Sequence, residues 1–269
     1  MIKDITFGQY FESNSLIHRL DPRAKLILLI LYIVFIFLCK TIYSLLFLTI
    51  VFFAVIYISK VPITMYLKNL KSILPIVIFT GLINLFYNDS GRTLFNIFKI
   101  KVTTGGIYQA SFMSLRILLL ILISSVLTYT TTPNDLTDAI ENLLKPFSLI
   151  GLSVAVHTLA MMMTIALRFI PTLVEETQKI MNAQKARGAD LENGKFKERL
   201  KALIPILIPL LISSVRRAYE LAEAMECRCY NGGVGRVRMK RLKYSFSDLI
   251  ALVFSLVSCA AVIIINIKV

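Results

Sequence analysis

The sequence predicts an all-α polytopic membrane protein with about five transmembrane helices and a cytoplasmic domain of three further helices. Three observations lead to this fold class. Hydrophobic residues make up 57% of the chain and its mean hydropathy is +0.73, which is more apolar surface than one soluble core of this length can bury. Several apolar runs reach membrane length, and residues 132–245 hold 17 of the 30 Lys and Arg residues.

The strong positive charge of the chain fits a membrane protein. The formal net charge is +14 and the isoelectric point is about 9.7. An integral membrane protein reaches such values by concentrating Lys and Arg on its cytoplasmic side. Basic residues interleaved with aromatic residues along one face are absent, so we do not expect a nucleic-acid partner.

The first two spans lie between Leu26 and Ser59, where Lys40 is the only charged residue. As a single helix these 34 residues would measure about 51 Å, against a hydrocarbon core of about 30 Å. The chain is therefore predicted to double back at Lys40. The first 25 residues are polar and contain Asp21-Pro22, so we expect no cleavable signal peptide.

Three further apolar runs are predicted to span the bilayer: Ile73–Tyr87, Ile107–Thr131 and Phe246–Ile267. The first is short and reaches membrane length if Lys68 and Lys71 snorkel from its start. Arg116 interrupts the second, and Asp248 lies near the edge of the third. The predicted domains are a membrane region (1–131), a cytoplasmic region (132–245) and a C-terminal transmembrane helix (246–269).

The distribution of cations predicts the orientation. Four basic residues precede the first span: Lys3, Arg19, Arg23 and Lys25. Together with the basic 132–245 region they place the N-terminus in the cytoplasm and the C-terminus outside. Three cations in residues 88–106 weaken this pattern, but the inverse topology fits less well.

The cytoplasmic region is predicted to begin with a helix at Thr132-Pro133. Thr132 can cap it, Pro133 suits the first helical position, and Asp135 places negative charge at the exposed amide groups. The helix is expected to stop before Pro146. Asp135, Asp138 and Glu141 share a face of this helix, which we interpret as a solvated surface.

Two long helical patterns follow, one from about Ser153 and one from about Phe196. Their first halves are apolar, whereas their second halves are too charged to cross a bilayer. Each ends in an arginine between small residues, Ala186-Arg187-Gly188 and Cys227-Arg228-Cys229, and an alanine precedes each arginine by four positions. One cation at a helix end is commonly explained by the helix dipole, but two in the same local frame predict docking into a partner with two complementary sites.

Other features of the two long helices are candidates for partner contacts. Met161, Met162 and Met163 form a run that we interpret as a repackable contact surface, with His157 as a packed histidine beside it. Pro171 is expected to mark a bend or a packing contact. Four scattered cysteines match no metal-site spacing and no glycine-rich phosphate loop is present, so we expect no metal, no cofactor and no catalytic residue.

The sequence resembles the transmembrane T component of energy-coupling factor transporters, which are importers related to ABC transporters. The matching segments are Leu20–Leu26, Thr131–Pro133, Arg168–Pro171 and Ala183–Gly188. The second tip departs from the usual Ala-Arg-Gly, because cysteines flank Arg228, although cysteine is also small.

The resemblance implies a scaffold that hydrolyses nothing itself. In that family the T component joins a substrate-binding membrane S component to two cytoplasmic ABC-type ATPases, for vitamin or metal-ion uptake across the bacterial cell membrane. Arg187 and Arg228 would dock in the two ATPases, with Ala186, Gly188, Cys227 and Cys229 as close-packed flanks. The three cytoplasmic helices would then form a coupling domain.

Two alternatives from other classes stay open at this stage. A membrane-embedded enzyme would need converging polar groups at membrane depth, and the candidates are Arg116, His157, Ser124 and Ser125. A self-sufficient channel or secondary transporter would be expected to show an internal repeat or a broken helix, and the sequence shows neither.

Overall fold

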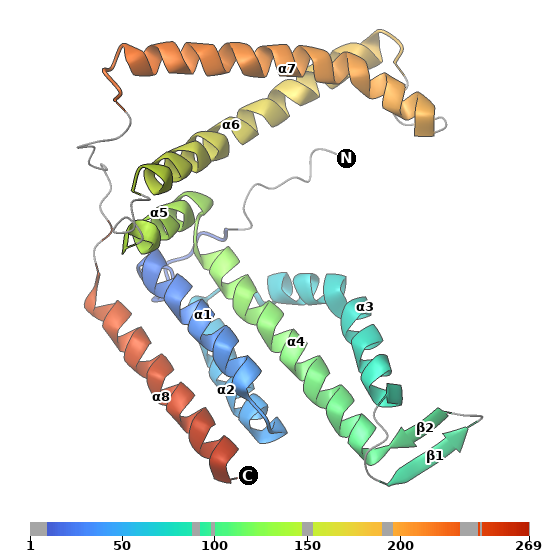
Figure 1. Ribbon diagram of the computed structural model, residues 1–269. Coiled ribbons are helices and arrows are strands. Elements are labelled where there is room, and N and C mark those ends of the chain that lie inside the picture. Colours follow the sequence, from blue (N-terminus) through green and yellow to red (C-terminus); the bar gives the residue numbers. More distant parts are fainter. Residues whose placement is uncertain are drawn as a thin grey trace. The chain divides into compact units, whose positions relative to one another are not determined.

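The computed structural model describes residues 10–87, 92–97, 100–146, 153–189, 196–231, 242 and 244–268. Within these residues the chain forms eight helices and one short hairpin (Figure 1). The elements are α1 (Pro22–Leu38), α2 (Ile42–Ser59), α3 (Ile63–Tyr87), β1 (Thr93–Ile97), β2 (Ile100–Thr103), α4 (Thr104–Thr130), α5 (Pro133–Leu144), α6 (Ser153–Ala186), α7 (Phe196–Glu226) and α8 (Phe246–Lys268).

The predominantly helical fold confirms the predicted class. The chain reverses at residues 39–41, so the predicted turn at Lys40 is confirmed. Two details differ. α3 begins at Ile63, ten residues before the predicted start, because Lys68 and Lys71 lie inside the helix and not ahead of it. The antiparallel β1–β2 pair was not expected, since a pairing of five and four residues leaves only a weak sequence pattern.

In the part of the chain that the structure describes, six helices are long and apolar enough to cross a membrane: α2, α3, α4, α6, α7 and α8. The 17-residue α1 is one residue shorter than the 18-residue α2, the shortest of the six. The chain is therefore a multi-pass membrane protein. α6 and α7 are the least apolar of the six, with a hydropathy of 1.4 against 1.7–2.7 for the others. The placement of these two helices in the cytoplasm, outside the bilayer, stays a prediction.

The described residues fall into two compact units. Residues 10–139 and 242–268 form one, which we call the membrane unit, and residues 140–231 form the other, which we call the coupling unit. In the membrane unit α1, α4, α2 and α8 pack in a ring, each against the next and α8 against α1. Ile36, Leu45, Leu119 and Val262 from these four helices are fully buried.

One carboxylate caps two neighbouring helices of the membrane unit. Asp248 Oδ2 accepts a hydrogen bond from the backbone N–H of Ser245 at 2.6 Å, at the start of α8. Its Oδ1 accepts from the backbone N–H of Asp21 at 2.8 Å, at the N-cap of α1. Asp21 in turn accepts from the N–H of Arg23 at 2.9 Å. Two helix N-termini, each with positive dipole charge, thus share buried negative charge.

The same end of the unit ties α1 to α4 and to the preceding turn. The buried Lys25 ammonium donates to the carbonyl of Thr130 at 2.8 Å, and to the carbonyl of His18 at 3.3 Å. His18 contacts the carbonyl of Phe11 through Nε2 at 2.8 Å and the Ser15 hydroxyl through Nδ1 at 2.7 Å. Much of the Leu20–Leu26 motif therefore serves to fasten helix ends together.

α3 packs closely along α4. A side-chain carbon at Gly81 would lie 3.1 Å from Ser114 Oγ, so the small residue allows the close approach. Asn69 donates to Ser125 Oγ at 2.6 Å, and the Tyr129 hydroxyl donates to the carbonyl of Met65 at 3.2 Å. Figure 1 shows α3 bending along its length, and Pro75 inside it removes one helical hydrogen bond.

Candidate functional site

The α6 tip ends in a Schellman motif with Arg187 as the C-cap. Gly188 takes the left-handed conformation, with φ of +87°. Its N–H donates to the carbonyl of Lys185 at 3.0 Å, and the N–H of Ala189 donates to the carbonyl of Gln184 at 3.0 Å. These two bonds define the motif. Ala186, Arg187 and Gly188 are all exposed.

The α7 tip repeats this motif residue for residue. Cys229 occupies the left-handed position, with φ of 56°. Its N–H donates to the carbonyl of Glu226 at 2.8 Å, and the N–H of Tyr230 donates to the carbonyl of Met225 at 3.1 Å. Arg228 is the C-cap, as Arg187 is at the other tip, and Cys227, Arg228 and Cys229 are all exposed. The similar sequences around Arg187 and Arg228 therefore have the same backbone geometry.

α6 and α7 pack against each other and run in opposite directions (Figure 1). Glu176 of α6 meets Ser213 and Arg217 of α7 at their crossing. Beyond that point α6 continues for about 15 Å to its tip and α7 for about 20 Å to its own, at 1.5 Å per residue. Because the helices are antiparallel, Arg187 and Arg228 lie on opposite sides of the crossing.

A polar contact fixes the register of this crossing. Arg217 Nη2 lies 3.0 Å from Glu176 Oε2, and the buried Ser213 hydroxyl donates to Glu176 Oε1. The side chains of Arg217 and Glu176 are 36% and 21% exposed, so the pair is partly screened and its value is modest, about 1 kcal/mol. The contact matters more for geometry than for stability, because it fixes which residues of α6 and α7 meet. Sequence reasoning assigned no role to this contact, because no local pattern links residues 37 positions apart.

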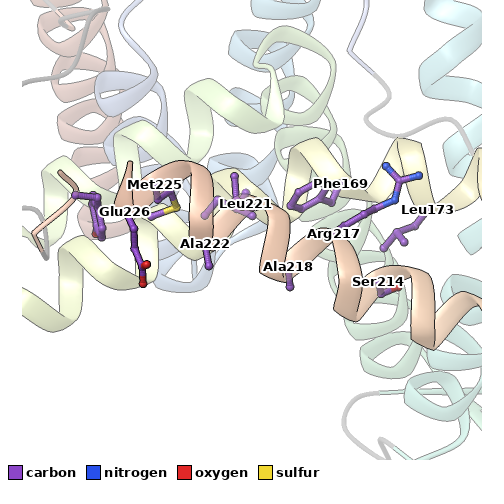
Figure 2. Close-up of a pocket in the computed structure, with 11 residues that line it drawn as sticks. Phe169, Leu173, Ser214, Arg217, Ala218, Leu221, Ala222, Met225 and Glu226 are labelled. Atoms are coloured by element: carbon purple, nitrogen blue, oxygen red, sulfur yellow. The ribbon is translucent and has the colours of Figure 1, made fainter. Parts of the chain in front are cut away.

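Apolar side chains line a groove of about 500 Å³ beside the crossing (Figure 2). α6 contributes Ile165, Phe169 and Leu173. The α7 wall runs from Ser214 to Met225 and reaches Tyr230 at the tip. Leu211 and Val215 of α7 do not line the groove and are 66% and 48% exposed. Those two residues belong to an outward apolar face of α7.

The other predicted contact residues lie on α6. Met162 is 58% exposed, whereas Met161 and Met163 are half-buried. Pro171 lies inside the continuous helix with its side chain exposed. A partner contact at Met161–Met163 and Pro171 stays a prediction.

The acidic face of α5 is not wholly solvated, which corrects the interpretation from sequence. Glu141 is only 6% exposed, and its Oε1 lies 3.6 Å from Nδ1 of the half-buried His157 at the start of α6. The helix start itself is as predicted: Thr132 Oγ1 accepts from the N–H of Asp135 at 3.2 Å and donates to its carboxylate at 2.8 Å.

The polar groups at membrane depth have structural partners. Arg116 donates to the carbonyl of Cys39, the C-cap of α1, at 2.7 Å and lies 4.5 Å from the centre of the Phe112 ring. Ser124 and Ser125 donate to the carbonyls one turn earlier in α4. Among the described residues no group of three or more His, Cys, Asp or Glu side chains could hold a metal ion. These groups therefore stabilise helix ends and backbones.

Comparison with known proteins identifies the family of the chain. A family model described as "Cobalt transport protein" (CbiQ) matches residues 13–240. The energy-coupling factor transporter transmembrane protein EcfT of Ruminiclostridium cellulolyticum is 52% identical over 93% of this chain and 92% of its own length. EcfT of Clostridium kluyveri is 52% identical over 96% and 95%, and EcfT of Bacillus subtilis is 45% identical over 98% of both chains.

The fold and these matches define a class, that of multi-pass, non-catalytic subunits of membrane transporters. Within it, the chain belongs to the CbiQ family of transmembrane T components of energy-coupling factor transporters. The resemblance found in the motifs is thereby confirmed.

Proposed function

We propose that this chain is the scaffold of an energy-coupling factor importer. In this role it joins two cytoplasmic ABC-type ATPases to one membrane S component that binds a vitamin or a metal ion. ATP-driven closure of the ATPase pair would move the α6 and α7 tips, and the two helices would pass that movement to the S component. The relatives' names support membership in a multi-subunit transporter.

The observation that carries the proposal is the equivalence of the two tips. Each presents an exposed arginine at the C-cap of a Schellman motif, and the two lie on opposite sides of the crossing. Two identical geometries at opposite ends suit two ATPase subunits of similar surface. A planar, permanently charged guanidinium can bond several acceptors in each docking site at once.

The outward faces of α6 and α7 are the proposed site for the S component. Met162 and Pro171 are exposed on α6, and an unbranched methionine side chain repacks readily against different partners. The proposed location is the bacterial cell membrane, with the N-terminus and the coupling unit in the cytoplasm.

Charge reversal at the tips tests the docking role. Arg187→Glu and Arg228→Glu are each expected to reduce co-purification of the ATPases and transport by about tenfold, and the double variant by more, since a charge-assisted bond becomes a repulsion. Lys179→Glu on α6 and Lys201→Glu on α7 are matched controls, because both residues are exposed on the same helices away from the tips. Undiminished ATPase in the double variant would refute the docking role.

The native cysteines provide a second test without any substitution. Cys227 and Cys229 flank Arg228 and are exposed, whereas Cys39 and Cys259 are 1% and 2% exposed. In the purified chain a maleimide is therefore expected to label the tip cysteines alone. In the assembled transporter this labelling should slow by at least about tenfold, as a docked surface excludes the reagent. Equal labelling rates would place the α7 tip outside the ATPase interface.

A further inference from the structure

The ring of α1, α4, α2 and α8 encloses a cavity of about 410 Å³. It lies at the end of the membrane unit where α1 and α8 begin and where α2 and α4 end. Its walls include Leu29 and Tyr32 of α1, Val55 of α2, Leu127 of α4 and Phe254 of α8. The turn that precedes α1 contributes Leu16, Ile17 and Leu20.

The cavity is unsuited to water. A buried water needs two to four polar partners, and three of the four polar side chains at this cavity, those of Lys25, Thr130 and Tyr32, are already bonded elsewhere. The Lys25 ammonium has three acceptors, the carbonyls of Thr130 and His18 and the Thr131 hydroxyl. The Thr130 hydroxyl donates to the carbonyl of Val126, and the Tyr32 hydroxyl pairs with Ser258. The remaining walls are almost entirely apolar.

The size and opening of the cavity favour a lipid chain as its occupant. At roughly 30 Å³ for each water-sized group, the cavity holds about 14 such groups, far more than a benzene-sized cavity of roughly 150 Å³. Four of its wall residues, Leu16, Ile58, Ile250 and Phe254, are 45–66% exposed. In a multi-pass protein such exposed apolar residues face hydrocarbon, so an acyl chain can enter sideways from the bilayer.

Two cations are close in sequence to wall residues of the cavity. Arg19 lies in the turn that contributes Ile17 and Leu20, and Lys60, the C-cap of α2, is two residues after Ile58. Both side chains are exposed, and the exposed acid of the preceding segment is Glu12. Cations at the end of a span attract the phosphate of an anionic headgroup by about 1 kcal/mol each.

We propose that the cavity binds one acyl chain of an anionic phospholipid, whose phosphate lies against Arg19 and Lys60. The chain fills the space between α1 and α2, which face each other across the ring, and completes the packing of the membrane unit. This proposal rests on the ring and not on the proposed ATPase docking.

The test uses the full chain reconstituted in vesicles of equal phosphatidylglycerol and phosphatidylethanolamine. After extraction in a mild detergent, native mass spectrometry counts the lipids that each chain retains. The wild type is expected to retain one phosphatidylglycerol. Val55→Trp fills the cavity and should reduce the lipid-bound fraction at least about fivefold, whereas Phe53→Trp is the matched control, because Phe53 lies on the outer face of α2 and is 53% exposed.

Two further arms keep the proposal falsifiable. Arg19→Gln with Lys60→Gln is expected to abolish the preference for phosphatidylglycerol. If Val55→Trp does not fold, wild-type chain in vesicles with a phosphatidylglycerol that carries a photoactivatable acyl chain should crosslink at Leu29 and Tyr32, which line the cavity and are partly buried. Retention of no lipid by the wild type, equal retention of the two lipids, equal retention by Val55→Trp, or crosslinks confined to outward residues such as Phe53 would each overturn the proposal.

Discussion

At the scale of single residues, Cys229 shows that the α7 tip adopts the geometry of the α6 tip at some cost in stability. The left-handed conformation disfavours any residue with a side-chain carbon by about 1–2 kcal/mol, and glycine avoids this cost. The α6 tip has Gly188 at the same position of the same motif, whereas the α7 tip has cysteine there. The α7 tip keeps this backbone despite the strain, as expected if the proposed docking requires its geometry.

The effect of a substitution at Cys229 on the stability of the α7 tip should therefore depend on how readily the new residue adopts the left-handed conformation. Cys229→Gly is expected to preserve the tip or stabilise it by up to about 1 kcal/mol, because strain is removed. Cys229→Val is expected to weaken it by about 1–2 kcal/mol, since a β-branched residue resists this conformation. Hydrogen exchange of the Cys229 and Tyr230 amides, which donate the two bonds of the motif, measures both effects.

The neighbouring cysteine provides the matched control for this prediction. Cys227 lies in the same motif without a positive φ. Cys227→Val should change the exchange of the two amides by less than about 0.5 kcal/mol, as expected for an exposed substitution. Equal effects of valine at both positions would show that bulk, and not backbone conformation, limits the tip.

His18 predicts how the stability of the membrane unit depends on pH. Burial, aided by the positive charge of Lys25, lowers the pKa of His18 below 6.5. As the pH falls through 6.5, the unfolded chain takes up the proton first, so stability present at pH 7 is lost toward pH 5. The thermal midpoint in detergent should therefore fall between pH 7 and pH 5.

The substitution His18→Gln should make the thermal midpoint less dependent on pH, whereas His157→Gln should leave its fall toward pH 5 in place. An unchanged fall in His18→Gln would contradict the role given to His18.

At the scale of elements, the packing of α3 on α4 depends on a small residue. A side-chain carbon at Gly81 would meet Ser114 Oγ at 3.1 Å. Gly81→Ala should cost less than about 1 kcal/mol, because Ser114 can move slightly, whereas Gly81→Leu should cost about 1–3 kcal/mol by overpacking. The thermal midpoint in detergent measures both, and Leu82→Phe on the exposed side of α3 is the neutral control. A midpoint unchanged in Gly81→Leu would mean that the two helices do not rely on this contact.

The elements that sequence reasoning predicted well are those that local signals define. The cap at Thr132, the turn at Lys40 and the stop at Gly188 each depend on residues a few positions apart. The partners of Asp248, Glu141 and Glu176 could not be predicted, because they lie 16 to 227 positions away in sequence. A single sequence carries no signal for such pairs. The shared backbone geometry of the two tips could be anticipated because their two local sequence patterns are alike.

At the scale of the whole molecule, the coupling unit consists of two long helices, α6 and α7, that are joined by a polar contact at their crossing. Glu176, Ser213 and Arg217 fix that point, and about 15–20 Å of helix extends from it to each tip. A helix transmits displacement along its length because its backbone bonds resist bending. A movement imposed at one tip would thus be carried through the crossing to the other helix, as the proposed coupling function requires.

The distribution of cations predicts the orientation of the molecule, which the tip cysteines can test. Seventeen of the 30 Lys and Arg residues lie in residues 132–245, and the positive-inside tendency predicts that this region lies in the cytoplasm. Cys227 and Cys229 are exposed within it, whereas Cys39 and Cys259 are buried. A membrane-impermeant maleimide should therefore label the chain in inside-out vesicles and leave it unlabelled in right-side-out cells. Permeabilised cells are the control for reactivity, and labelling of intact cells would place the tips outside, where no cytoplasmic ATPase could reach them.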